Sequence, residues 1–143
     1  MTVELILKLK GTEVVTIAPD MTLEKAARLL SERRIGALVI SSNGQSVDGI
    51  LSERDIVRAM ARLGRDALDA PADKAMTRDV VTCSRTDRVE DLMAVMTAKR
   101  IRHLPVVEDG VLAGMISIGD VVKSRIEEVE LEARSLREYI SGY

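Results

Sequence analysis

The chain has 143 residues, enough for one domain or for two small repeats that share a fold. The composition, with 46% hydrophobic, 31% charged and only 1% aromatic residues, predicts a folded protein with an aliphatic core. The chain lacks the aromatic platforms that bind single-stranded nucleic acid. The formal net charge of -2 lacks the basic excess that non-specific binding to nucleic acid or to anionic membranes requires.

The first 62 residues predict an N-terminal helix followed by one strand–helix–hairpin–helix unit. Residues 1–11 contain a helix over Val3–Leu9 that ends at Gly11. Residues 12–62 form the first unit, with a helix behind the N-cap Thr22. Its strands are expected at Val14–Ile17, Ala37–Ser41 and Val47–Leu51.

Residues 63–79 are predicted to form a linker, and residues 80–125 are predicted to form a second unit of the same kind. The linker is broken by Gly64 and Pro71 and has one short helix near Ala72–Met76. In the second unit a helix follows the expected N-cap Asp87, and strands are expected at Val80–Cys83, His103–Val107 and Val111–Ile116. Pro105 cannot donate to a strand ladder, so its strand should lie at an edge or leave that position to a ligand.

The second unit repeats the first. With a shift of 66 residues, Val14-Val15-Thr16 aligns with Val80-Val81-Thr82, and Arg34-Ile35 with Arg100-Ile101. After one extra residue in the first hairpin, Ser52 and Asp55 align with Ser117 and Asp120. One unit alone buries little apolar surface, so we expect a mixed α/β fold in which two β-α-β-β-α repeats pack sheet to sheet with pseudo-two-fold symmetry.

The duplicated segments 49–55 and 114–120 resemble the signature of cystathionine-β-synthase-type (CBS) domains. That signature is glycine, two apolar residues, Ser or Thr, two variable residues and Asp. A tandem of two such domains is a Bateman module. The resemblance implies binding of adenosine-containing ligands in clefts between the repeats: AMP, ADP, ATP, S-adenosylmethionine and, in some members, NAD(H).

The resemblance further implies two crossed sites, each combining the Ser/Asp motif of one repeat with the first two strands of the other. One site joins Ser52 and Asp55, with Arg54 nearby, to Val81, Thr82, Ile101, Arg102, His103 and Pro105. The other joins Ser117 and Asp120 to Val15, Thr16, Ile35, Gly36 and Ala37. Both keep the Ser/Asp pair, so both are expected to be competent.

The motif residues suit this chemistry. A serine where a strand enters a helix offers a hydroxyl beside free backbone N–H groups, and a carboxylate three residues on can accept both ribose hydroxyls. Arg102 and His103 replace Gly36 and Ala37 of the first repeat and suit phosphate, so the two sites differ in charge. The same serines and aspartates also fit plain helix caps, and capping is compatible with ligand contact.

The last predicted element is a helix over residues 126–143. Val122, Ile126, Val129, Ala133, Leu136 and Ile140 alternate spacings of four and three, which is a heptad stripe. Such a stripe needs a partner surface, and we expect a homodimer, with a regulated partner protein as a second possibility. CBS domain proteins commonly form disc-like homodimers, which agrees.

The single cysteine and the single histidine limit the kinds of metal and disulfide sites that the chain can form. Cys83 is the only cysteine and His103 the only histidine, which excludes an internal disulfide, a thiolate cluster and a paired-histidine metal site. The N-terminus has no signal-peptide pattern, and no apolar run is long enough to span a membrane. We therefore expect a cytoplasmic, non-catalytic sensor of AMP, ADP or ATP that requires no metal. The alternatives are an NAD(H)-binding redox sensor with one mononucleotide and one dinucleotide site, and a structural dimeric adaptor.

Overall fold

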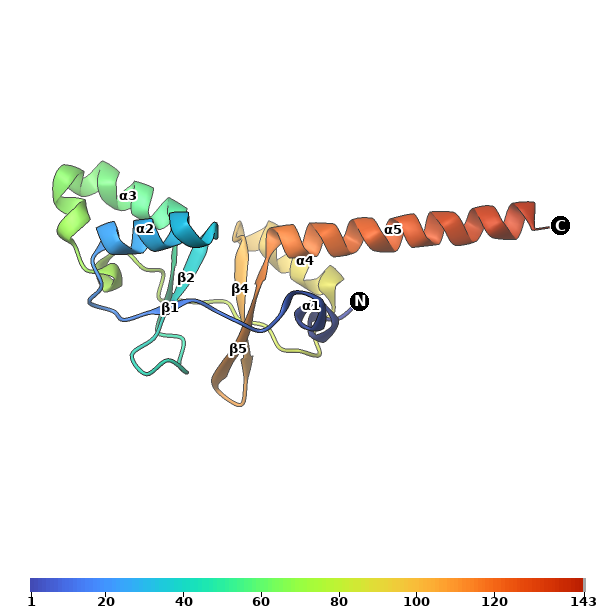
Figure 1. The fold of residues 1–143 in the computed structure, drawn as a ribbon, viewed down its shortest axis with the longest axis horizontal. Helices are drawn as coiled ribbons and strands as arrows, with labels where there is room; N and C mark the ends of the chain where they lie inside the picture. Colours follow the sequence, from blue (N-terminus) through green and yellow to red (C-terminus); the bar gives the residue numbers. More distant parts are fainter. Residues whose placement is uncertain (143) are drawn as a thin grey trace.

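The computed structural model describes residues 1–142 and has the expected order of elements (Figure 1). The helices are α1 (Val3–Lys10), α2 (Leu23–Arg33), α3 (Glu53–Leu63), α4 (Val89–Lys99) and α5 (Ile118–Ser141), with short 3-10 helices η1 (Gly64–Asp69) and η2 (Ala72–Lys74). The strands are β1 (Thr16–Ile17), β2 (Ala37–Ile40), β3 (Gly49–Ser52), β4 (His103–Glu108) and β5 (Val111–Ser117).

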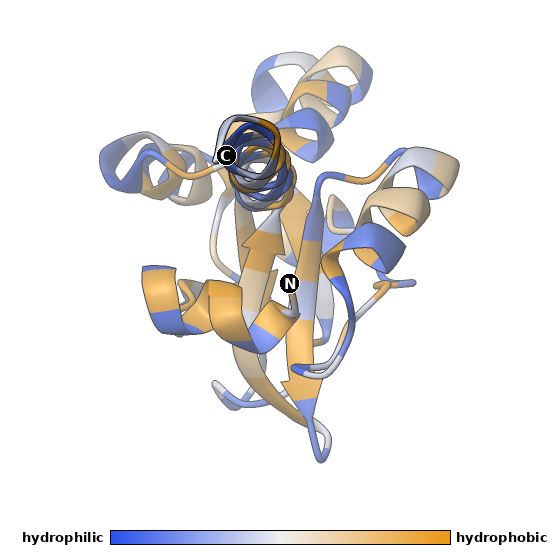
Figure 2. Cartoon of the chain, turned by 90° about the vertical axis from the view of Figure 1, so that its right-hand side faces the viewer, coloured by the Kyte–Doolittle hydropathy of each residue, from blue (hydrophilic) through white to orange (hydrophobic). Residues whose placement is uncertain are grey.

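Each repeat has its own small sheet, and the two sheets lie side by side between the helices. In the first repeat β1 pairs parallel with β2, which pairs antiparallel with β3; in the second, β4 pairs antiparallel with β5. The strands are largely hydrophobic, as Figure 2 shows, and the hairpins of the two repeats touch where the Leu112 N–H donates to the Gln45 carbonyl at 2.8 Å. The mixed α/β fold of two β-α-β-β-α repeats is thus confirmed.

The expected strand over Val80–Cys83 is reduced to a single bridge between Cys83 and Val106. Its counterpart in the first repeat is held by the Val39 N–H, which donates to the Val15 carbonyl at 3.2 Å. Pro105 stands at the position of Val39 and has no N–H to donate, so the second repeat lacks this hydrogen bond. The strand predicted over Val80–Cys83 was therefore too long at its N-terminal end.

One predicted cap is wrong. The Thr22 side chain accepts from the Lys25 N–H as expected, but α4 begins after Arg88, which makes no side-chain cap. The Asp87 carboxylate instead accepts the Ser84 N–H at 2.9 Å, and the Asp87 N–H donates to the Ser84 carbonyl. Asp87 therefore closes the turn before the helix, a local bond that competes with capping.

The core is divided into two clusters, and each cluster is completed by a segment outside the two strand–helix units. Helix α1, which precedes the first repeat, packs Val3, Ile6 and Leu7 into the core of the second. The linker helices, which follow the first repeat, pack Ala67 and Ala72 into the core of the first. The two repeats are therefore connected by more than their sheets.

Helix α5 continues the second repeat far beyond its core. It runs unbroken from Ile118 to Ser141, and its C-terminal half extends away from the rest of the described chain (Figure 1). Only Val121 and Ser124 of this helix are buried. Among the described residues, no helix is both long and apolar enough to cross a membrane.

Candidate functional site

The last strand of each repeat ends at a serine that caps the following helix. Ser52 accepts the Asp55 N–H through its hydroxyl, and the Asp55 carboxylate accepts the Ser52 N–H at 2.8 Å and its hydroxyl at 3.0 Å. Ser117 and Asp120 form the same box at the start of α5. The duplicated motif therefore folds as two capping boxes, which fix each carboxylate at a helix N-terminus, where the helix dipole favours negative charge.

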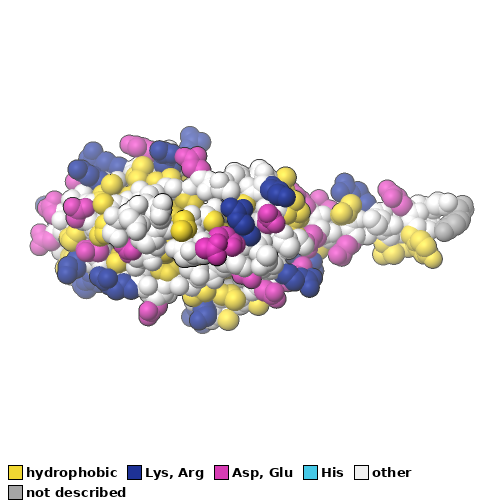
Figure 3. Space-filling model, turned by 90° about the horizontal axis from the view of Figure 1, so that it is seen from below, with side chains coloured by type: hydrophobic (Ala, Val, Ile, Leu, Met, Phe, Trp, Pro, Cys, Tyr) yellow, Lys and Arg dark blue, Asp and Glu magenta, His cyan; other side chains and the backbone are white. Residues whose placement is uncertain are grey.

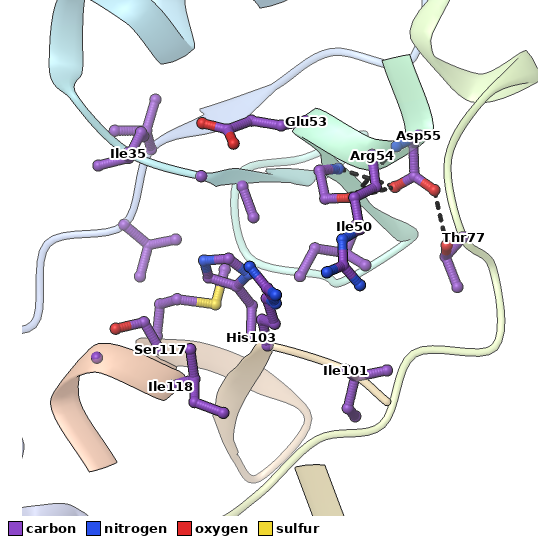
Figure 4. A pocket seen from close by; sticks show the side chains of 18 of the residues that line it. Ile35, Ile50, Glu53, Arg54, Asp55, Thr77, Ile101, His103, Ser117 and Ile118 are labelled. Atoms are coloured by element: carbon purple, nitrogen blue, oxygen red, sulfur yellow. Dashed lines mark hydrogen bonds between the residues drawn. The ribbon is translucent and has the colours of Figure 1, made fainter. Parts of the chain in front are cut away.

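A cleft of about 550 Å³ lies between the repeats and is lined by residues from both. That volume is in the range of small-molecule sites. Figure 4 shows Asp55 and Arg54 on one side, Ser117 and Ile118 on the other, and His103 between them. The cleft thus brings together the motif serines of both repeats.

His103 is half-buried in the middle of this cleft, and Gly36 makes room for it. A Cβ at Gly36 would lie 3.1 Å from the Cε1 atom of His103. Burial lowers the pKa of His103 below its ordinary value; Lys10 and Arg102 act in the same direction, against Glu53 and Asp120. The lowered pKa favours the neutral imidazole, and an anion placed beside it would favour its protonation.

Several cations line the cleft. Arg34 and Arg100 end α2 and α4 at equivalent positions, both with left-handed backbone. The remaining basic side chains of the lining are Arg54, Arg58, Arg102 and Lys10, and the acidic ones are Glu13, Glu53 and Asp55. The cleft is positive on balance, which suits a phosphate-bearing ligand.

The two motif carboxylates have different partners. Asp55 is 7% exposed and lies near the Thr77 hydroxyl at 3.4 Å and the Arg58 guanidinium at 3.5 Å. Asp120 pairs with the Lys10 ammonium at 2.7 Å. Burial alone would raise the pKa of Asp120, but the hydrogen bonds from Lys10 and Ser117 outweigh burial and hold that pKa below its usual value.

Most of the residues expected at the two sites lie together in this one cleft. Those lining it are Ser52, Arg54, Asp55, Ile101, Arg102 and His103 of the first expected site, and Ser117, Val15, Ile35, Gly36 and Ala37 of the second. Thr16, Val81, Thr82, Pro105 and Asp120 are not among its lining residues. The assignment of these residues to a ligand stays a prediction.

Sequence reasoning missed Lys10, Thr77, Arg34 and Arg100 as lining residues. For the two arginines the signal was present, because the repeat alignment pairs Arg34 with Arg100. Lys10 and Thr77 lie outside the two duplicated strand–helix units, and they reach the motifs only because α1 packs on the second unit and the linker on the first. Among residues 1–142, no group of three or more His, Cys, Asp or Glu residues could hold a metal ion.

Comparison with known proteins decides the family. A scan against protein families matches the CBS domain twice, over residues 9–62 and 72–127. The chain belongs to the CBS domain family. It carries two CBS domains in tandem, as the duplicated motif predicted.

Other CBS domain proteins share its sequence and fold. A solved CBS-domain containing protein of Agrobacterium tumefaciens, ATU1752, is 45% identical, with a TM-score of 0.85 over 87% of this chain and 99% of that one. The mitochondrial CBS domain-containing protein CBSX3 of Arabidopsis thaliana is 35% identical over 127 residues, which are 86% of this chain but only 62% of that relative.

The CBS domain pair of protein MJ0100 has the same fold at 24% identity, with a TM-score of 0.79 over 90% of this chain and 98% of that one. That CBS pair was solved in complex with 5'-methylthioadenosine and S-adenosyl-L-methionine.

Proposed function

We propose that this CBS domain pair is a non-catalytic, cytoplasmic sensor that binds an adenosine phosphate, AMP, ADP or ATP, in the cleft between its repeats. The observation that carries the proposal is the position of Asp55: a carboxylate fixed by its capping box, on the wall of a cleft that arginines also line. The adenosine ligands of the MJ0100 pair, which has the same fold, support the choice of ligand class.

Each group in the cleft has a chemical task in this proposal. The Asp55 carboxylate accepts the ribose hydroxyls, and Ser52 holds it in place through its N–H and hydroxyl. The adenine contacts apolar residues of the lining, Ile50 and Ile101, which lie on the side of Asp55 in Figure 4. Arg102 and His103 bind phosphate, and His103 gains a proton as the anion arrives.

A binding experiment tests the proposal. The purified chain is titrated with AMP, ADP, ATP, NAD, NADH and S-adenosylmethionine in a thermal-shift assay. A ligand at a hundred times its dissociation constant stabilises the fold by about 2.7 kcal/mol, which raises the melting temperature of a chain this size by several degrees. Selective shifts with AMP, ADP or ATP support the proposal. Shifts with NADH alone favour the redox sensor, and no shift with any ligand favours the structural adaptor.

Two variants connect that shift to the site. Asp55→Asn keeps the size of the side chain and an oxygen that accepts the Ser52 N–H, but it loses one acceptor and the charge. It should abolish the shift. Asp91→Asn is the matched control, because Asp91 lies exposed in the first turn of α4 and outside the lining of the cleft. An undiminished shift in Asp55→Asn would refute the site.

The partner we propose for α5 is a second copy of this chain. The stripe residues Val122, Ile126, Val129, Leu136 and Ile140 are between 44% and 71% exposed, and Figure 3 shows hydrophobic side chains on the projecting helix. In a parallel pair of such helices, Arg125 faces Glu130 of the second copy and Glu132 faces its Arg137, so both flanking contacts join opposite charges.

Sedimentation equilibrium of the wild-type chain and of Val129→Glu/Leu136→Glu tests this pairing. We expect a dimer for the wild type and a monomer for the variant. A control, Glu127→Lys/Glu138→Lys, changes charge outside the stripe and the facing pairs, and it should remain dimeric. A monomeric wild type would refute the pairing.

A further inference from the structure

Each of the two motif carboxylates, Asp55 and Asp120, is contacted by a different segment outside the duplicated strand–helix units. In the first repeat, Thr77 exchanges backbone hydrogen bonds with Ile50, and its hydroxyl lies 3.4 Å from Asp55. In the second, the Lys10 ammonium donates to the Met115 carbonyl at 2.9 Å and to Asp120 at 2.7 Å. Met115 is the repeat equivalent of Ile50, so Lys10 and Thr77 act at equivalent places.

The packing next to these residues is equivalent as well. The side chain of Met76, beside Thr77, fills the space that a Cβ at Gly49 would take, and Leu7 of α1 does so at Gly114. Gly49 and Gly114 open the two motifs. Helix α1 and the end of the linker are therefore structural counterparts, although one is a helix and the other is extended.

What differs is how closely a cation is held at the carboxylate. Asp55 has only long contacts to the Thr77 hydroxyl, at 3.4 Å, and to the exposed Arg58 guanidinium, at 3.5 Å, and it lies on the wall of the cleft. Lys10 brings an ammonium to Asp120, and it is Lys10, not Asp120, that lines the cleft. In both halves one carboxylate oxygen accepts two donors, but at Asp55 both come from the capping serine, whereas at Asp120 one of them is the Lys10 ammonium at 2.7 Å. A ribose hydroxyl that approaches Asp120 therefore has to compete with a charged donor.

We propose that Lys10 determines which half of the cleft accepts a nucleotide. The Ser52/Asp55 half takes the ribose, while Lys10 closes the Ser117/Asp120 half, so that one nucleotide binds per chain. This rests on the proposed function and changes the expectation that both halves are competent. A second ribose would have to break the contact between Lys10 and Asp120, and binding there is weaker by about 10- to 100-fold, as expected for one charge-assisted hydrogen bond.

Equilibrium dialysis with radiolabelled ATP measures the number of nucleotides bound per chain. The test variant is Lys10→Met, which keeps an unbranched apolar stem and removes the ammonium. The matched control is Lys8→Met, since Lys8 is an exposed lysine of the same helix. We expect one ATP per chain for the wild type and for Lys8→Met, and two for Lys10→Met. Adding Asp120→Asn to Lys10→Met should return the number to one.

Three results would overturn the inference. Two equivalent ATP molecules on the wild type would show that Lys10 closes nothing. One ATP on Lys10→Met, with its circular dichroism spectrum unchanged, would show that removing the ammonium does not open the second half; if that variant fails to fold, Lys10→Thr, which copies Thr77, replaces it. If ATP binds to no variant, the dialysis is repeated with AMP and ADP, and absence of binding of all three nucleotides would remove the proposed function and this inference with it. The first two results leave the proposed function standing.

Discussion

Helix α1 belongs to the core of the second repeat, and two leucines of that helix make this testable. Leu7 is 1% exposed and packs against Gly114, whereas Leu9, two residues on, is 73% exposed. Leu→Ala changes helix propensity equally at both positions. Any difference between Leu7→Ala and Leu9→Ala therefore measures the packing of α1 on the second repeat.

The expected difference is large. Replacing a fully buried leucine with alanine lowers the free energy of unfolding by about 2–5 kcal/mol, whereas replacing an exposed leucine changes it by about 0.5 kcal/mol or less. For 143 residues the entropy of unfolding is about 0.3 kcal/mol per degree, so a loss of about 3 kcal/mol lowers the melting temperature by about 10 °C.

The assay is urea and thermal unfolding followed by far-ultraviolet circular dichroism. A further variant tests the specific contact. The Cβ of Gly114→Ala would lie 2.8 Å from a methyl group of Leu7, so Gly114→Ala is destabilising alone but fills part of the space left by Leu7→Ala. The double variant should be more stable than the sum of the two losses predicts. Equal unfolding free energies for Leu7→Ala and Leu9→Ala would refute the placement of α1.

Three further predictions follow from single residues. The pKa of His103 is lowered in the folded chain, so as the pH falls below the unfolded value of about 6.5 the unfolded chain takes up a proton before the folded chain does, and the free energy of unfolding decreases. Urea unfolding between pH 7.5 and 5.5 should show this decrease for the wild type and not for His103→Gln. Gly36→Ala should shift the ring proton resonances of His103 in NMR spectra, whereas Gly119→Ala, with only an ordinary contact to Ser117, should not; an unmoved signal in Gly36→Ala contradicts the close approach. Burial raises the pKa of the Cys83 thiol to about 12, so an aromatic disulfide reagent should label it only after unfolding, and rapid labelling of the native chain would show that the thiol is accessible.

The sequence predicted the elements whose signals are local or duplicated. Ser52 and Ser117 could be assigned to strand ends because each is followed by the same motif, and helical spacing located α2 and α4. Asp87 could not be assigned correctly, since the turn to Ser84 and a helix cap are competing uses of one carboxylate. The sequence places Lys10 more than a hundred residues from Asp120, and no local pattern links a lysine of one helix to the first turn of another.

The packing of α1 on the second repeat has a consequence for synthesis of the chain. By the time residue 77 has been made, the first repeat has every residue of its core cluster, including Ala67 and Ala72 from the linker. Helix α1 is made before the second repeat and has to wait for Val121, the last core residue of that repeat. During that interval Val3, Ile6 and Leu7 have no native surface to cover them, so α1 is an apolar segment that chaperones can bind until the second repeat is complete.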